Sequence, residues 1–298
     1  TGTWSDRAYN EAKKFCNPIK INNSNFTNDL NSLKFNEIIE TKKLEKILDK
    51  DNSYTYICSN ETVNGLEYRE DGVKLPKCDS NLIVDMSSDF LTKKVDWNNI
   101  SVAFACTSKN LGMSGANIVV IDEKIFDRKR LYENKIPGIL DWNLYNETDS
   151  LYNTPAIFNI YVIEKLLKYY NKKGIDVIEN ESKLKAELMY EYLDNNDLFY
   201  KPFVSKINKI HRSYMNIPFL VCDGDGIIME EFLEHMYNSN IVGLRTKTPF
   251  KFEDFNMKEP LRVSFYNGIS VEDVKYLIKR MEEFKQKILF KTNYYKNQ

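Results

Sequence analysis

Two residues with chemically useful side chains follow short apolar segments of the sequence. Asp85 comes directly after the apolar residues 82–84, and Lys109 lies three residues after the apolar run 102–106. Apolar runs of this length are typical of strands that are buried on both faces of a mainly parallel sheet. Because ligands of such sheets gather at the carboxyl ends of strands, we expect Asp85 and Lys109 at one ligand-binding edge.

A carboxylate and an amine placed in this way can form a pyridoxal-phosphate site. The lysine would form a Schiff base with the cofactor, and the aspartate would keep the pyridine nitrogen protonated, which makes the ring an electron sink. Spacing alone leaves two other interpretations open. A lysine just after a strand is more often exposed to solvent, and an aspartate there is more often a turn or a helix cap.

Other common catalytic motifs do not occur in the sequence. It contains no GxGxxG, P-loop, GxSxG or HExxH pattern. Residues 224–226 (GDG) lack the further oxygen ligands that a cation-binding loop needs, so they predict a turn. Five scattered cysteines without a CxxC pair, and only two histidines, predict reduced thiols and neither a disulfide framework nor a metal site.

The balance of charge narrows the partners that we expect. Lys and Arg number 42 against 43 Asp and Glu, which leaves a formal net charge of -1 and predicts no nucleic-acid partner. The longest apolar runs are too short to cross a bilayer, and no signal segment opens the sequence. We therefore expect no membrane partner and a cytoplasmic location.

The pattern of apolar residues predicts an α/β protein with two domains. The expected strands are residues 54–58, 82–84, 102–106, 118–121, 215–221 and 261–266, and the expected helices begin near Ser5, Pro155, Ile175 and Ser270. The first four strands predict a mainly parallel sheet in a large domain, residues 1–173. The remainder predicts a smaller α+β C-terminal domain, residues 174–298.

The last helix has the clearest local signature. Ser270 and Asp273 form a capping box at its start. Apolar residues then recur with helical spacing on one face, at positions 274, 277, 278, 281, 284 and 288. This pattern predicts an amphipathic helix.

Several segments resemble those of one known enzyme family. Residues 85–115 (DMSSDFLTKKVDWNNISVAFACTSKNLGMSG) are similar to its DxSSxxLS and AGAQKNxGPAG cores. Four further matches come in the family's order: residues 58–65 resemble CxNETIxG, 151–155 resemble MxNTPPTF, 212–219 resemble RSRMNVPF, and 261–268 resemble MRASIYNAM. The family is that of the phosphoserine aminotransferases, class-V aminotransferases of fold type I that use pyridoxal phosphate. The resemblance spans nearly the whole chain.

The resemblance implies roles for the matching residues around the cofactor. Lys109 would be the Schiff-base lysine, and Asp85 would be the partner of the pyridine nitrogen. Thr62 would lie beside the cofactor's ring oxygen, and Trp4, otherwise a core tryptophan, would stack on the ring. Ser108 replaces a family glutamine and can still donate a hydrogen bond to the cofactor phosphate.

Three further residues match positions that bind anions in the family. Asn153 and Thr154 would reach the phosphate of the neighbouring subunit's cofactor, which implies a homodimer. Thr154 as N-cap and Pro155 as first helical residue would place a helix N-terminus at that anion. Arg262 matches the arginine that pairs with the substrate's α-carboxylate, a role that suits a bidentate guanidinium; its alternative is a surface ion pair.

The sequence also departs from the family's pattern. The Gly-His-Arg run that binds the substrate phosphate has no clear counterpart, although Arg245 or Lys247 could replace it. The family's opening segment, with a glycine-rich phosphate-binding loop, has no equivalent in these 298 residues. We therefore expect this chain to bind pyridoxal phosphate weakly.

The resemblance implies transamination between L-glutamate and 3-phosphohydroxypyruvate, giving 2-oxoglutarate and O-phospho-L-serine, a reaction of serine biosynthesis. A related phosphorylated substrate of vitamin B6 synthesis stays open. A non-catalytic homologue that keeps the fold and the dimer interface is the alternative. A desulfurase is disfavoured because no cysteine lies in a convincing reactive loop.

Overall fold

The computed structural model describes residues 2–21, 37–48, 54–127, 136–245 and 258–296, with side chains described as far as residue 291. Its largest sheet has four strands in the order β1-β4-β5-β6. These strands are β1 (Tyr54–Cys58), β4 (Asn81–Asp85), β5 (Val102–Cys106) and β6 (Asn117–Ile121). They fall where the apolar runs predict them.

Three of the four strands run parallel, as expected. β1 pairs with β4 and β4 with β5 in parallel, with Cys58 opposite Asp85 and Asp85 opposite Phe104. The prediction of a strand buried on both faces is wrong for β6. It pairs antiparallel with β5, and no residue of β6 is buried. Because apolar runs do not reveal strand direction, the sequence could not distinguish this strand from its neighbours.

Two smaller sheets accompany the first. β2 (Asn60–Glu61) and β3 (Leu66–Glu67) form an antiparallel pair directly after β1. β7 (Tyr200–Pro202), β8 (Asn216–Val221) and β9 (Leu261–Ser264) form an antiparallel three-stranded sheet. The strands expected in the second half of the chain are thus present, with β9 two residues shorter than predicted.

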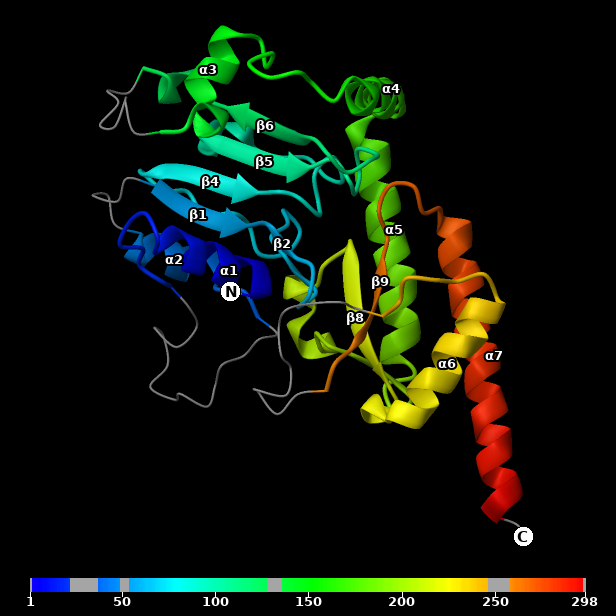
Figure 1. The fold of residues 1–298 in the computed structure, drawn as a ribbon. Coiled ribbons are helices and arrows are strands. Elements are labelled where there is room, and N and C mark those ends of the chain that lie inside the picture. The colour runs from blue at the N-terminus through cyan, green and yellow to red at the C-terminus, as the bar shows by residue number, and fades with distance from the viewer. Residues whose placement is uncertain (1, 22–36, 49–53, 128–135, 246–257, 297–298) are drawn as a thin grey trace.

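The helices surround and connect these sheets. They are α1 (Thr3–Ala12), α2 (Thr41–Ile47), α3 (Trp142–Glu147), α4 (Ile157–Lys173), α5 (Ile175–Asp194), α6 (Gly226–Asn238) and α7 (Val271–Lys296). The described residues also form the short 3₁₀ helices η2 (Trp97–Asn99), η3 (Glu123–Ile125), η4 (Gly138–Leu140), η5 (Lys206–His211) and η6 (Cys222–Gly224). Figure 1 shows α5 extending from the level of the large sheet to β8 and β9, with α6 and α7 beyond it.

The buried apolar side chains form two clusters. The first surrounds the large sheet and includes Leu82, Val84 and Ala103, whereas the second surrounds the small sheet and includes Phe219, Phe232 and Phe284. α5 contributes to both, because its early residue Ile178 joins the first cluster and later residues such as Met189 join the second. This arrangement favours the expected two domains, whose boundary at residues 173–174 remains a prediction.

Gly174 allows the chain to turn at this boundary. Its φ of 85° lies in the left-handed region, which residues with a Cβ rarely adopt. α4 ends at Lys173 and α5 begins at Ile175, so one glycine separates two long helices.

The helix ends show which capping signals operate. Asp273 N–H donates to the Ser270 hydroxyl at 3.1 Å, and Ser270 N–H donates to the Asp273 carboxylate at 2.8 Å, so the capping box is confirmed. Asp225 is the N-cap of α6, because its side chain accepts hydrogen bonds from the N–H groups of Ile227 and Ile228. The predicted turn at residues 224–226 therefore leads directly into this helix. Among the described residues, no helix is both long and apolar enough to span a membrane.

Candidate active site

The first part of the site lies where β4 ends. Asp85 is the last residue of β4 and is partly buried. Its Oδ1 atom accepts a hydrogen bond from the Ser87 N–H at 2.8 Å, and its Oδ2 atom accepts one from the Tyr56 hydroxyl at 3.3 Å. Burial, together with the nearby Cys58 and Asp85, raises the pKa of Tyr56. The tyrosine therefore keeps its proton and orients the carboxylate as a donor.

Lys109 lies on a tight turn that follows β5. The Thr107 hydroxyl braces this turn, because it lies 2.5 Å from the Met113 carbonyl oxygen and 3.0 Å from that of Ala116. Gly112 has a φ of 110°, and a Cβ atom there would lie 2.7 Å from a methyl group of α4. Lys109 itself is half-buried, and within the described ranges its ammonium forms no hydrogen bond or ion pair. Its amine is therefore placed by its backbone and not by a partner.

Ser108 lies between Lys109 and the loop that follows Asp85. Its exposed hydroxyl is 3.5 Å from the Cys106 sulfur, and that sulfur is 3.7 Å from the Ser87 carbonyl oxygen. The two parallel strand ends therefore bring the regions of Asp85, Ser108 and Lys109 together, as the sequence predicts.

Thr62 connects three parts of the site. Its buried hydroxyl donates to the Ser88 hydroxyl at 3.0 Å, and Ser88 lies in the loop that follows Asp85. Its carbonyl oxygen lies 3.5 Å from Nη1 of Arg262. Contacts within the chain thus place the predicted substrate arginine beside the predicted cofactor residue.

Trp4 is brought to Thr62 by the neighbouring Glu61. The Glu61 carboxylate accepts hydrogen bonds from the backbone N–H groups of Trp4 and Ser5, at 2.9 Å and 2.8 Å. These are unpaired N–H groups in the first turn of α1, where a carboxylate is favourable. Gly2 permits the approach, because a Cβ atom there would lie 2.3 Å from the Glu61 side chain. α1 therefore begins at Thr3, two residues before the predicted start.

Arg262 has no salt-bridge partner among the described residues. Burial lowers the pKa of its guanidinium, and its Nε atom is buried with no hydrogen-bond partner in the described part of the chain. Beyond the long contact to Thr62, no hydrogen bond or ion pair joins the Arg262 side chain to the described residues. A half-buried guanidinium of this kind is suited to a carboxylate or phosphate ligand.

Asn153 and Thr154 lie apart from this cluster. Both are exposed, and the Asn153 side chain donates to the Tyr145 hydroxyl at 3.4 Å. The prediction that Thr154 caps a helix is wrong. α4 begins at Ile157 with Ala156 as its N-cap and no side-chain cap, so Pro155 precedes the helix.

The candidates for a substrate-phosphate site have different outcomes. Arg245 pairs with the exposed Glu230, and its backbone bridges to Leu261, next to Arg262. Its guanidinium is half-exposed, and a role in binding phosphate remains a prediction. Lys247 lies outside the described residues.

The sequence analysis did not identify the buried polar residues that hold the site residues in place. Glu61, Ser88 and Asn60 are buried, and Asn60 Nδ2 donates to Ser88 Oγ at 2.8 Å and to Asn216 Oδ1 at 2.7 Å. Their signal is present in the sequence, because each lies within a segment that matches the family. Polar residues that are buried without an assigned role are candidates for positioning the others.

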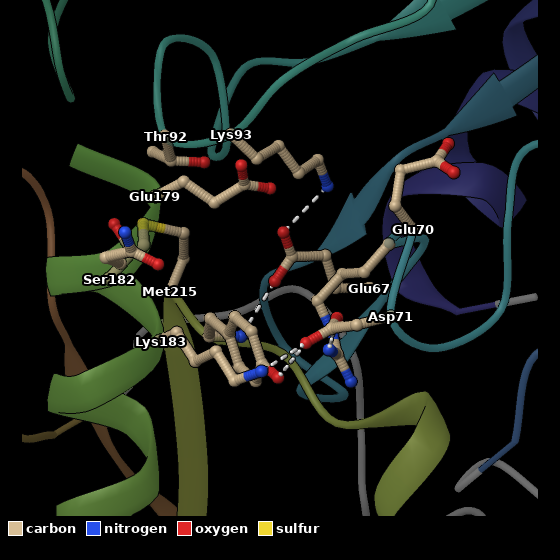
Figure 2. Close-up of a pocket in the computed structure, with 12 residues that line it drawn as sticks. Glu67, Glu70, Asp71, Thr92, Lys93, Glu179, Ser182, Lys183 and Met215 are labelled. Carbon is tan, nitrogen blue, oxygen red and sulfur yellow. Dashed lines mark hydrogen bonds and ion pairs between the residues drawn. The ribbon is translucent and has the colours of Figure 1, made fainter. Parts of the chain in front are cut away.

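A separate cavity of about 200 Å³ opens between β3, the loop around Lys93 and α5 (Figure 2). Lys93 Nζ there contacts Glu67 Oε1 at 2.7 Å, and the Tyr214 N–H donates to Glu67 Oε2 at 2.7 Å. Lys183 Nζ lies 3.1 Å from Asp71 Oδ2. None of the predicted site residues lines this cavity, and most of its charged side chains already have a partner of opposite charge. The cavity is therefore not a candidate for the active site.

The cluster around Asp85 fits pyridoxal phosphate and an acidic substrate. Among the described residues, the buried Trp4 indole N–H and Arg262 Nε are two of the donors without a hydrogen-bond partner, and the half-buried Lys109 ammonium forms no hydrogen bond or ion pair. Buried polar atoms without a partner are rare in folded proteins, so Trp4 and Arg262 are candidates for contact with a ligand. An amine, an aromatic donor and a guanidinium are the groups that a covalently held anionic cofactor and a carboxylate substrate require.

The comparison with protein families decides the assignment. The aminotransferase class-V family matches residues 22–277. The chain belongs to this family. A probable phosphoserine aminotransferase of Dictyostelium discoideum is 34% identical over 288 residues, which cover 95% of this chain and 70% of that protein. The phosphoserine aminotransferase of Campylobacter lari is 32% identical and covers 96% and 73%.

Solved structures agree with this assignment. The phosphoserine aminotransferase of Bacillus circulans subsp. alkalophilus superposes with a TM-score of 0.82 at 27% identity, over 96% of this chain and 72% of that one. A phosphoserine aminotransferase of Trichomonas vaginalis solved with bound pyridoxal phosphate gives a TM-score of 0.77 at 27% identity, over 95% and 73%. The fold-type-I aminotransferase fold, the enzyme class and the cofactor are confirmed, and the non-catalytic alternative is not favoured.

Proposed function

We propose that this aminotransferase transfers the amino group between L-glutamate and 3-phosphohydroxypyruvate, forming 2-oxoglutarate and O-phospho-L-serine. The relatives named phosphoserine aminotransferase support this choice of substrates. The observation that carries the proposal is Arg262. Its half-buried guanidinium lies beside Thr62 and has no carboxylate partner among the described residues, as a substrate-binding cation requires.

Each predicted residue has a task in this reaction. Pyridoxal phosphate, when bound, supplies an electron-poor ring that stabilises negative charge at the substrate's α-carbon. Asp85 would hold the ring nitrogen protonated, and its fixed hydrogen bonds to Tyr56 and Ser87 keep it oriented for that. Lys109 would hold the cofactor covalently and move the proton at the substrate's α-carbon.

The remaining residues would bind and orient. Trp4 would stack on the ring, Thr62 would lie beside the ring oxygen, and Ser108 would donate to the phosphate. Arg262 would pair with the α-carboxylate through two parallel N–H donors, which fixes the direction of the α-carbon as well as binding the substrate.

We also propose that the enzyme is a homodimer. Leu151, Ile157 and Phe158 flank Asn153 and Thr154, and their exposed fractions are 61%, 72% and 64%. Exposed apolar side chains gathered in this way are typical of a protein interface. A two-fold interface here would let Asn153 and Thr154 reach the other subunit's phosphate.

The state of the cysteines bears on where the enzyme acts. The five cysteines are all unpaired, which supports a reducing compartment such as the cytosol.

Product analysis at saturating cofactor tests the proposed reaction. L-Glutamate with 3-phosphohydroxypyruvate should give O-phosphoserine, and pyruvate in its place should react far more slowly. Arg262→Lys should raise KM for both substrates about 10- to 100-fold, since a bidentate charge-assisted pair is lost, and leave cofactor affinity unchanged. Equal rates with pyruvate would refute the phosphorylated substrate, and an unchanged KM would refute the role of Arg262.

A further inference from the structure

The segment that follows β9 links the two halves of the candidate site. β9 carries Arg262, and residues 265–269 connect β9 to α7. Asn267 lies in this segment and is half-buried. Its position between the substrate arginine and the helix makes it the point where the small sheet meets the turn of Lys109.

Asn267 forms hydrogen bonds with both loops that carry the cofactor residues. Its backbone N–H donates to Oδ1 of Asn110 at 3.0 Å, and Asn110 directly follows Lys109. Its side-chain Nδ2 donates to the carbonyl oxygen of Leu91 at 2.9 Å, in the loop that follows Asp85. Leu91 has a φ of 60°, a left-handed conformation that is uncommon for leucine. One residue therefore holds the Asp85 loop and the Lys109 turn.

Asn110 is fixed on every side. It is 4% exposed, and its Nδ2 donates to the Phe90 carbonyl oxygen at 3.0 Å. Its own carbonyl oxygen accepts from the Tyr170 hydroxyl at 2.8 Å. Because the Lys109 ammonium has no partner among the described residues, the contacts of Asn110 set where Lys109 projects.

Lys185 fixes the same segment from the opposite side. Its ammonium donates to the carbonyl oxygens of Phe265, Tyr266 and Ile269 at 3.0, 3.2 and 2.9 Å. The side chain is 2% exposed and comes from α5, so residues 265–269 are tied to that helix. The segment is thus held rigidly between α5 and the Lys109 turn.

We propose that Asn110 and Asn267 are positioning residues that fix the separation of Lys109 and Arg262. The proposal rests on the proposed function, in which Arg262 binds the α-carboxylate and Lys109 moves a proton at the α-carbon. These two substrate groups are joined by one covalent bond, so the cation and the amine must be held at a matching separation. An error of about 1 Å in such a pair can slow a reaction about 100-fold.

Alanine variants test the proposal with a matched control. Asn267→Ala removes the bond to Leu91, and Asn110→Ala removes the acceptor for the Asn267 N–H. Asn196→Ala is the control, because it deletes two side-chain hydrogen bonds just after the C-terminal end of α5, one to the Tyr192 carbonyl oxygen at 2.7 Å and one from the Lys285 ammonium at 2.6 Å. We expect kcat/KM to fall about 10- to 100-fold in the first two variants and to stay within about threefold in the control.

Two readouts separate positioning from a loss of folding. Cofactor affinity, followed by visible absorbance, should stay within about threefold of wild type in all variants. Binding of glutarate, a dicarboxylate without the amino group of L-glutamate, should weaken about 10-fold in Asn110→Ala and Asn267→Ala, together with a rise in KM. If Asn267→Ala binds glutarate and turns over like Asn196→Ala, the inference is wrong and the proposed function stands. If the wild-type chain forms no visible cofactor band and binds no glutarate, the proposed function fails and the inference falls with it.

Discussion

Removal of the Lys93 ammonium should destabilise the fold strongly. Lys93 Nζ lies 2.7 Å from Glu67 Oε1 and 2.8 Å from Asp89 Oδ2, and the side chains of Lys93, Glu67 and Asp89 are 11%, 2% and 0% exposed. Burial alone would lower the pKa of Lys93, but Asp89 and Glu67 outweigh it and raise that pKa. In Lys93→Met, two buried carboxylates would face each other without a cation. Breaking a buried ion pair in this way costs about 3–5 kcal/mol.

The neighbouring lysine provides the control. Lys94 pairs with Asp176, but their side chains are 58% and 68% exposed, so Lys94→Met should leave the free energy of unfolding almost unchanged. Urea unfolding followed by circular dichroism measures both. A loss of 3–5 kcal/mol should lower the midpoint by at least about 1 M.

The pH dependence of the destabilisation distinguishes charge burial from lost packing as its cause in Lys93→Met. The penalty in Lys93→Met comes from two buried negative charges without a cation, so it is present at neutral pH and is relieved when acid removes those charges. The difference between Lys93→Met and wild type should therefore shrink from pH 7 to pH 5. Equal midpoints for Lys93→Met and Lys94→Met would refute the reasoning. A loss of unfolding free energy that does not change with pH would mean that lost packing causes the destabilisation.

Three further predictions concern other parts of the molecule. Asp85→Asn should keep the cofactor but slow turnover by roughly 100-fold or more in a coupled glutamate assay, because the ring loses electron-withdrawing power; near-normal turnover would remove Asp85 from this role. Burial lowers the pKa of His211, so the stability that its neutral form provides is complete above about pH 6.5 and is lost as pH falls through the folded pKa. The gap in unfolding free energy between wild type and His211→Gln should then narrow from pH 7 to pH 5, and a constant gap would contradict this. Light scattering at micromolar concentration, with cofactor bound, should show a dimer, and a monomer alone would contradict the proposed interface.

The sequence predicted the elements well where local patterns determine them. The apolar runs located β1, β4 and β5, and the capping box located the start of α7, because burial and helix capping act within a few residues. Strand direction depends on distant partners, which explains why β6 was assigned wrongly. Thr154 shows a related limit, since a residue suited to capping a helix does not determine where that helix begins.

The sequence predicted the reactive residues of the site, but it did not predict the contacts that position them. Spacing placed Asp85 and Lys109 at strand ends, and the resemblance added Thr62, Trp4 and Arg262. The contacts that assemble them join positions far apart in sequence, such as Trp4 with Glu61 and Asn110 with Asn267. No local pattern encodes such pairs. Unpaired donors such as Arg262 Nε become visible only when the surrounding chain is in place.

Reductive labelling tests the central claim most directly. The chain is incubated with saturating pyridoxal phosphate, treated with borohydride to fix any cofactor bound to a lysine, digested, and mapped by mass spectrometry. The account predicts one labelled peptide, with the modification on Lys109, and loss of the label together with the visible cofactor band in Lys109→Ala. A label on another lysine, or a band that persists in Lys109→Ala, would contradict the assignment of Lys109 as the cofactor-binding residue.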